Sequence, residues 1–116
     1  MTSTGAIWKE TDPKGRVLTM LRSTWEGHIS ADHMEVDSPE AVRLTVADPD
    51  FIVGEINGKS RSSVYYRQGA CATFPELKLA VVAQWETDER GRVVTAYVTK
   101  RAKSKGEIEW VRQLQR

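Results

Sequence analysis

The fold is decided by "FIVGEINGKSRSSVYYRQ", residues 51–68, in which two stretches rich in β-branched and aromatic residues flank "GKS". Such stretches are typical of strands, and a short connection that contains glycine is typical of a hairpin. The stretches "LKLAVVAQWE" (77–86) and "VVTAYVTK" (93–100) repeat the pattern around the turn "DERGR" (88–92). Short links between successive strands predict an antiparallel sheet of four strands.

Helical signals precede these strands. In "STWEGHISADH", residues 23–33, Ser23 and Glu26 form a capping-box pattern that predicts a helix from about Thr24 to His33. In "DSPEAVRLTVADPD", residues 37–50, Ser38 can cap a second helix, Pro39 suits its first position, and Pro49 ends it.

The two ends of the chain add shorter elements. "GAIWKE" and "RVLTML" flank "TDPKG" near the amino terminus, which predicts a short hairpin, and "GEIEWVRQLQR" at the carboxyl end fits an edge strand or a short helix. We therefore expect a single α+β domain over residues 1–116. One or two amino-terminal helices would pack on a four-stranded, possibly extended, antiparallel sheet.

Composition limits the class of protein. The chain has 116 residues, 40% hydrophobic and 28% charged, which is typical of one globular domain, and its net charge of +1 gives no global basic field. The single cysteine, Cys71, excludes an intrachain disulfide and a cysteine-cluster zinc site. The sequence shows neither a signal-peptide pattern nor a membrane span, so we expect a cytoplasmic protein with no membrane partner.

Both histidines of the chain, His28 and His33, lie in the first predicted helix. On an α-helical wheel of about 100° per residue they border an apolar stripe from opposite sides, roughly 140° apart, so a shared metal ion is not expected and we predict no cofactor. Asp32 follows His28 by four residues, close enough to orient its imidazole. Each histidine could still be a surface cap, a hydrogen-bonding core residue, or a catalytic acid or base.

The predicted strands carry polar side chains that could meet this helix. Strand alternation puts Thr95, Tyr97 and Thr99 on one face of their strand, and Arg61 on the face opposite Tyr66 in its own. Metal-free phosphodiester cleavage needs a histidine to move protons, a cation to stabilise charge and hydroxyls to position the phosphate. Alternatively, Thr and Tyr are simply favoured in strands, and Arg or Lys protects a sheet edge.

A set of motifs recurs in order along the chain: "WEGHI" (25–29), His33, "TVADPDFI" (45–52), "RSSVYY" (61–66), "LKLAVV" (77–82), "VVTAYVT" (93–99) and "KGEIEW" (105–110). This order resembles the phage and mobile-element branch of the barnase, EndoU, colicin and RelE ribonuclease superfamily, known as the BECR fold. The resemblance implies a RelE- or barnase-like fold and a toxin-like, metal-independent endoribonuclease in which the 2′-hydroxyl attacks the neighbouring phosphate. It also implies an RNA substrate and a neutralising inhibitor protein, or antitoxin.

The resemblance also assigns roles to individual residues. His28 would be the general acid or base, Arg61 the phosphate-binding cation, and Thr95 with Tyr97 the hydroxyls that line the site. Tyr66 and Lys78 would be accessory residues, and His33, which matches the second histidine of the pattern, would be either structural or catalytic. Together with Thr99, these three are the residues that we expect to bind the substrate.

The alternative is a non-catalytic module that has the same fold and binds RNA or a protein. The near-neutral net charge favours this reading, because RNA binding usually draws on a basic patch. The nuclease needs His28, Arg61 and either Thr95 or Tyr97 to converge within reach of one phosphate. A His28 buried far from Arg61 would favour the binding module.

Overall fold

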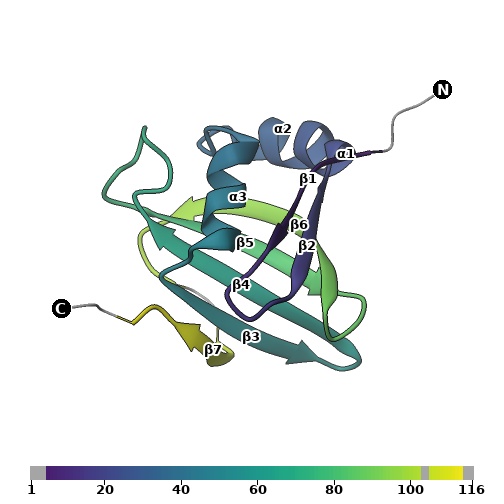
Figure 1. The fold of residues 1–116 in the computed structure, drawn as a ribbon. Coiled ribbons are helices and arrows are strands. Elements are labelled where there is room, and N and C mark those ends of the chain that lie inside the picture. The colour runs from purple at the N-terminus through teal and green to yellow at the C-terminus, as the bar shows by residue number, and fades with distance from the viewer. Residues whose placement is uncertain (1–4, 103–104, 114–116) are drawn as a thin grey trace.

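The computed structural model describes residues 5–102 and 105–113, apart from the side chain of Asn57. Its strands are β1 (Ala6–Thr11), β2 (Val17–Leu21), β3 (Phe51–Asn57), β4 (Ser60–Gln68), β5 (Lys78–Trp85), β6 (Arg90–Thr99) and β7 (Glu107–Val111). Its helical segments are α1 (Arg22–Thr24), η1 (Trp25–Ile29), α2 (Ser30–Asp32) and α3 (Pro39–Ala47). Within the described residues the strands form one mixed sheet in the order β1-β2-β6-β5-β4-β3-β7 (Figure 1).

This architecture corrects the expected fold class. The predicted RelE- or barnase-like arrangement, with a four-stranded antiparallel sheet under amino-terminal helices, is wrong: the described residues form a seven-stranded mixed sheet with two short helical regions. The amino-terminal hairpin β1–β2 is confirmed, but it joins the sheet because β2 pairs with β6 in parallel, with Val17 opposite Arg90. The carboxyl end forms a strand, β7, which pairs with β3.

The four central strands and α3 agree with the sequence pattern. Strands β3 to β6 pair antiparallel in chain order. Helix α3 begins where Ser38 accepts a hydrogen bond from the Ala41 N–H, with Pro39 in its first turn. It buries Val42 and Val46 against one face of the sheet (Figure 1). In the described part of the chain, no helix is long and apolar enough to cross a membrane.

The sheet is strongly curled. Strands β1 and β7 are its two edges, yet Arg16 in the β1–β2 turn lies 3.1 Å from the Glu109 carboxylate in β7. Arg16 also pairs at 2.9 Å with Asp12, whose side chain is fully buried. The right-handed twist of neighbouring strands accumulates across a wide sheet and brings the edges together. One buried ionic network therefore links opposite edges of the sheet.

Tyr65 completes this network, and its buried phenol makes the stability of the fold decrease at alkaline pH. Its hydroxyl donates a 2.6 Å hydrogen bond to Asp12, and burial, with that bond, raises the pKa of Tyr65 above its usual value of 10.0. The neutral phenol therefore makes its full contribution to the free energy of unfolding below about pH 10, the pKa of an unfolded tyrosine. This contribution is lost as pH rises toward the higher pKa of the folded state. We expect the free energy of unfolding, measured by urea denaturation, to fall above about pH 10. It should fall less in Tyr65→Phe; an equal fall in the variant would contradict the assignment.

Candidate active site

The helical stretch that carries His28 contains a π-helical turn. Segments α1, η1 and α2 run without interruption from Arg22 to Asp32, and the Ser30 N–H donates to the carbonyl of Trp25, five residues earlier. The predicted cap at Ser23 is wrong, because the stretch begins at Arg22 without a side-chain cap. Ile29 is fully buried and anchors the stretch in the core. π-Turns occur often at functional sites.

The two histidines lie close together where this helical stretch ends. The rings of His28 and His33 lie 5.4 Å apart between centroids, at an angle of 82°. The α-helical wheel had placed them on opposite borders of the stripe, and that expectation is wrong. His33 ends the stretch with a non-helical backbone, φ −129° and ψ 66°, so the wheel does not describe the direction of its side chain.

His28 is held on both ring nitrogens. Its Nδ1 lies 3.0 Å from Asp32 Oδ2, and its Nε2 lies 2.8 Å from Thr95 Oγ1 in β6. With the proton on Nδ1, the imidazole donates to Asp32 and accepts from the Thr95 hydroxyl. The His28 side chain is 43% exposed, so it is not a core residue. A base oriented by a carboxylate and directed at a hydroxyl is a catalytic arrangement.

His33 lies beside this pair, between Glu35 and Tyr97. Its Nδ1 is 3.5 Å from Glu35 Oε2, and its ring centroid is 6.3 Å from that of Tyr97. Glu35 Oε2 also accepts a 3.5 Å hydrogen bond from the Val98 N–H in β6, which ties the end of the helical stretch to the sheet. Glu35 was not among the predicted site residues, although its position two residues after a histidine was a usable signal.

Tyr97 remains a hydroxyl donor. Burial, together with the charge and hydrogen bond of Tyr66, raises the pKa of Tyr97 above its usual value of 10.0. Tyr66 itself is fully buried and stacks on Phe51, with ring centroids 4.9 Å apart. Tyr66 therefore contacts Tyr97 from within the core, and its ring is not accessible to a ligand.

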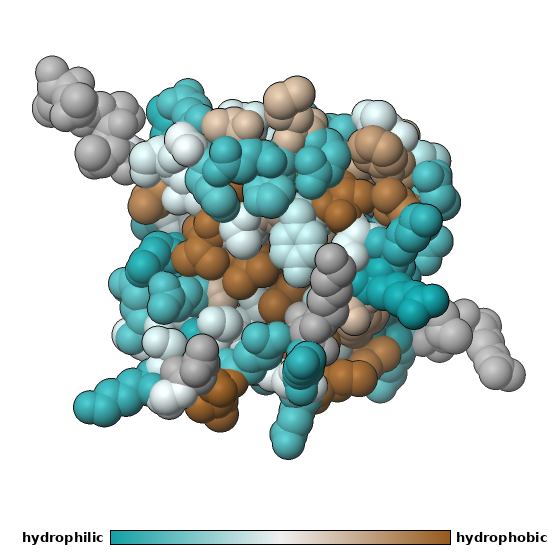
Figure 2. Space-filling view, turned by 180° about the vertical axis from the view of Figure 1, so that it is seen from behind, coloured by the Kyte–Doolittle hydropathy of each residue, from teal (hydrophilic) through white to brown (hydrophobic). Residues whose placement is uncertain are grey.

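Strand register shows which other polar residues share this face. Ala80 of β5 pairs with both Tyr66 and Tyr97, and Lys78, two residues earlier in β5, pairs with Thr99. Because side chains alternate, Lys78 lies on the face of Tyr97, about 7 Å along the strand from that row. Within the described part of the chain Lys78 has no ion-pair partner, so it can supply a cation. Figure 2 shows the molecule from behind, with apolar side chains near the middle of that side and hydrophilic ones around them.

Thr99 does not offer a hydroxyl to the same site. It is 7% exposed, and its Oγ1 donates a 2.8 Å hydrogen bond to the carbonyl of Arg101. The Arg101 N–H donates back to the same oxygen at 3.3 Å. The structure therefore places the Thr99 hydroxyl in the turn that follows β6.

Arg61 lies elsewhere. In β4, Arg61 lies on the same face as Tyr65, and Val64 lies on the opposite face. Val64 pairs with Val82 in β5, and Val82 pairs with Thr95 in β6, so Arg61 and Thr95 lie on opposite faces of the sheet. Arg61 instead forms a 2.8 Å ion pair with Asp88 at the far end of the sheet. The structure therefore brings together His28, His33, Thr95 and Tyr97, whereas Lys78 shares their sheet face four residues along β5 from Val82, the partner of Thr95. Arg61 does not join them, so the expected convergence of His28, Arg61 and Thr95 or Tyr97 on one phosphate is wrong.

The chemistry available at this cluster is proton transfer and hydrogen bonding. Among residues 5–102 and 105–113, no group of three or more His, Cys, Asp and Glu side chains is arranged to hold a metal ion. In comparisons with known proteins, no family model, no curated protein and no solved structure matches the chain.

Proposed function

We propose that the protein is a metal-independent, toxin-like endoribonuclease of the cytoplasm, with RNA as substrate and an inhibitor protein as partner. One observation carries the proposal: His28 is hydrogen-bonded to both Asp32 and Thr95, and its ring is 5.4 Å from that of a second histidine. Two imidazoles, one hydroxyl donor and an ammonium on the same sheet face are the groups that cleavage by an internal nucleophile requires.

His28 acts as the base. Asp32 holds the proton on Nδ1 and so leaves the Nε2 lone pair directed at a hydroxyl, which is that of Thr95 in the free protein. A ribose 2′-hydroxyl that takes this place gives its proton to Nε2, and its oxygen then forms a bond to the adjacent phosphorus. Thr95 then positions the substrate.

His33 acts as the acid. As the 2′-oxygen bonds to phosphorus, the bond from phosphorus to the 5′-oxygen breaks, and that oxygen takes a proton from His33. The products are a 2′,3′-cyclic phosphate and a 5′-hydroxyl. Tyr97 and Lys78 stabilise the charge that develops on the phosphate oxygens, the role first expected of Arg61.

The test uses RNA and DNA oligonucleotides of the same sequence in excess EDTA. We expect the RNA to be cut to 2′,3′-cyclic phosphate ends, identified by mass spectrometry, and the DNA to remain intact because it has no 2′-hydroxyl. A requirement for added divalent metal, or products with 3′-hydroxyl ends, would contradict the proposal. RNA binding without any cleavage would instead support the non-catalytic module.

A further inference from the structure

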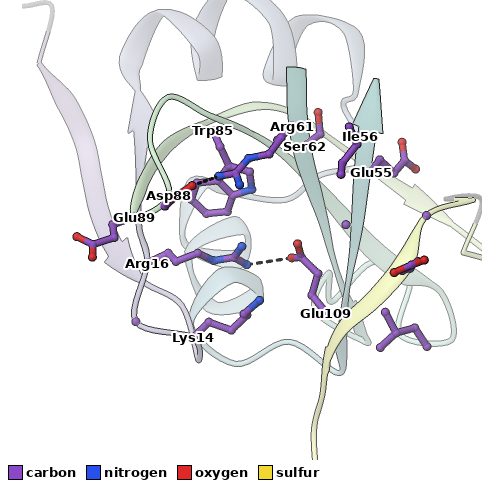
Figure 3. A pocket seen from close by; sticks show the side chains of 15 residues that line it. Lys14, Arg16, Glu55, Ile56, Arg61, Ser62, Trp85, Asp88, Glu89 and Glu109 are labelled. Carbon is purple, nitrogen blue, oxygen red and sulfur yellow. Dashed lines mark hydrogen bonds and ion pairs between the residues drawn. The ribbon is translucent and has the colours of Figure 1, made fainter. Parts of the chain in front are cut away.

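A hollow lies on the sheet face opposite Thr95. It is a cavity of about 870 Å³ between the β1–β2 turn and β7, and Figure 3 shows the Arg16–Glu109 and Arg61–Asp88 pairs within it. A volume of this size is typical of ligand sites. None of the proposed catalytic residues lines it.

The floor of this cavity is rigid. The Trp85 indole N–H donates to Ser63 at 2.8 Å, and the Ser63 hydroxyl donates to Glu109 at 2.8 Å. The Arg16 guanidinium lies 4.2 Å from the centroid of the Trp85 ring. A Cβ on Gly91 would come within 2.6 Å of that ring, so the indole packs directly on the backbone of β6. The hollow is therefore formed before any ligand arrives.

The charge around the cavity is negative, although the chain carries +1. Arg16 and Arg61 are already paired with carboxylates. The remaining charged residues that line it are Lys14, Glu55, Glu89 and Glu107. Three carboxylates against one ammonium favour a cationic occupant and repel the backbone of a nucleic acid.

The rim also exposes apolar side chains and an open strand edge. Ile56 is 78% exposed and Ile108 is 64% exposed, and both line the cavity. Within the described residues β7 pairs only with β3, so the backbone groups of its outer edge are unpaired. An extended peptide can add to such an edge with main-chain hydrogen bonds while alternate side chains enter pockets. A small cation would leave the isoleucines uncovered.

We propose that this groove, formed by the β1–β2 turn, β7 and the floor around Trp85, binds an extended segment of a partner protein that alternates Lys or Arg with aliphatic residues. The segment lies along the outer edge of β7. Its cations face Glu89 and Glu107, and its aliphatic side chains cover Ile56 and Ile108. This site is independent of the proposed nuclease activity.

The test is an NMR titration of the ¹⁵N-labelled full chain with two blocked heptapeptides, one alternating lysine and isoleucine, the other glutamate and isoleucine. We expect the basic peptide to shift the Trp85 indole signal and the β7 amides, and to bind at least about tenfold more tightly than the acidic one. Absence of these shifts, equal binding of both peptides, or shifts confined to the face of Thr95 would overturn the proposal.

A matched pair of variants separates specific docking from a general charge effect. Replacing both Glu89 and Glu107 by lysine should weaken binding of the basic peptide at least about tenfold. Glu76→Lys changes an exposed residue that does not line the cavity and should leave binding unchanged, whereas the single variant Glu107→Lys, with the same change in net charge, should weaken it. Equal weakening by Glu76→Lys would overturn the proposal. RNA cleavage by the double variant should stay at the wild-type rate, so the experiments test the peptide groove and the nuclease site independently.

Discussion

His28→Ala is expected to lower kcat/KM for RNA cleavage in EDTA by about 10²–10⁴-fold, the usual contribution of a positioned acid or base. The substitution removes the group that would accept the proton of the 2′-hydroxyl. Because the His28 side chain is 43% exposed, the fold should survive, which circular dichroism and thermal unfolding can check. Unchanged cleavage in this variant would eliminate the proposed site.

Arg61→Ala is the matched control. Arg61 and Asp88 form a surface pair, with side chains 47% and 89% exposed, on the face opposite Thr95. We expect the substitution to change kcat/KM by less than about threefold, which corresponds to under about 0.7 kcal/mol of transition-state stabilisation. A loss as large as that of His28→Ala would show that the cation of the site is Arg61, not Lys78.

Asp12→Ala should cause the largest loss of stability, about 3–5 kcal/mol, because it removes one partner of a buried ion pair. The Asp12 side chain is fully buried. It accepts hydrogen bonds from the N–H groups of Lys14 and Arg16, the Arg16 guanidinium and the Tyr65 hydroxyl. Its removal leaves the Tyr65 phenol without the acceptor of its hydrogen bond and leaves the Arg16 guanidinium with Glu109 alone.

Urea denaturation measures this loss of stability, and two further variants provide comparisons for its size. Asp12→Asn keeps the shape and one acceptor oxygen, so it should cost less than Asp12→Ala. Asp88→Ala breaks only the exposed pair with Arg61 and should hardly change the midpoint. If Asp12→Ala unfolds at the wild-type urea concentration, the network does not hold the edges of the sheet together.

Much of the secondary structure could be predicted because its signals are local. The cap at Ser38 and the prolines around α3 fix that helix within a few residues. Alternation and turn residues located β3 to β6, and "TDPKG" located the first hairpin. The parallel pairing of β2 with β6 joins segments about 70 residues apart, and no pattern within either segment records it.

The site was only partly predictable, because it depends on pairing between strands that are distant in the sequence. Thr95 and Tyr97 were placed on one face by alternation, but alternation alone cannot tell which face of β4 meets them. That requires the register Val64–Val82–Thr95, which puts Arg61 on the other face. The α-helical wheel likewise assumed a regular helix from Trp25 to His33, whereas the chain forms a π-turn at Trp25–Ile29 and leaves the helical conformation at His33.

The most direct test of the two-histidine mechanism uses RNA in which sulfur replaces the bridging 5′-oxygen at one phosphate. A thiolate leaves without taking a proton, so this substrate needs the base but not the acid. With the ordinary oxygen substrate in EDTA, His28→Ala and His33→Ala should both be slow, by about 10²-fold or more. With the sulfur substrate, His33→Ala should return to within about threefold of wild type, while His28→Ala stays slow. Full activity of either variant on the oxygen substrate, or equal rescue of both by sulfur, would contradict the division of proton transfer between His28 and His33.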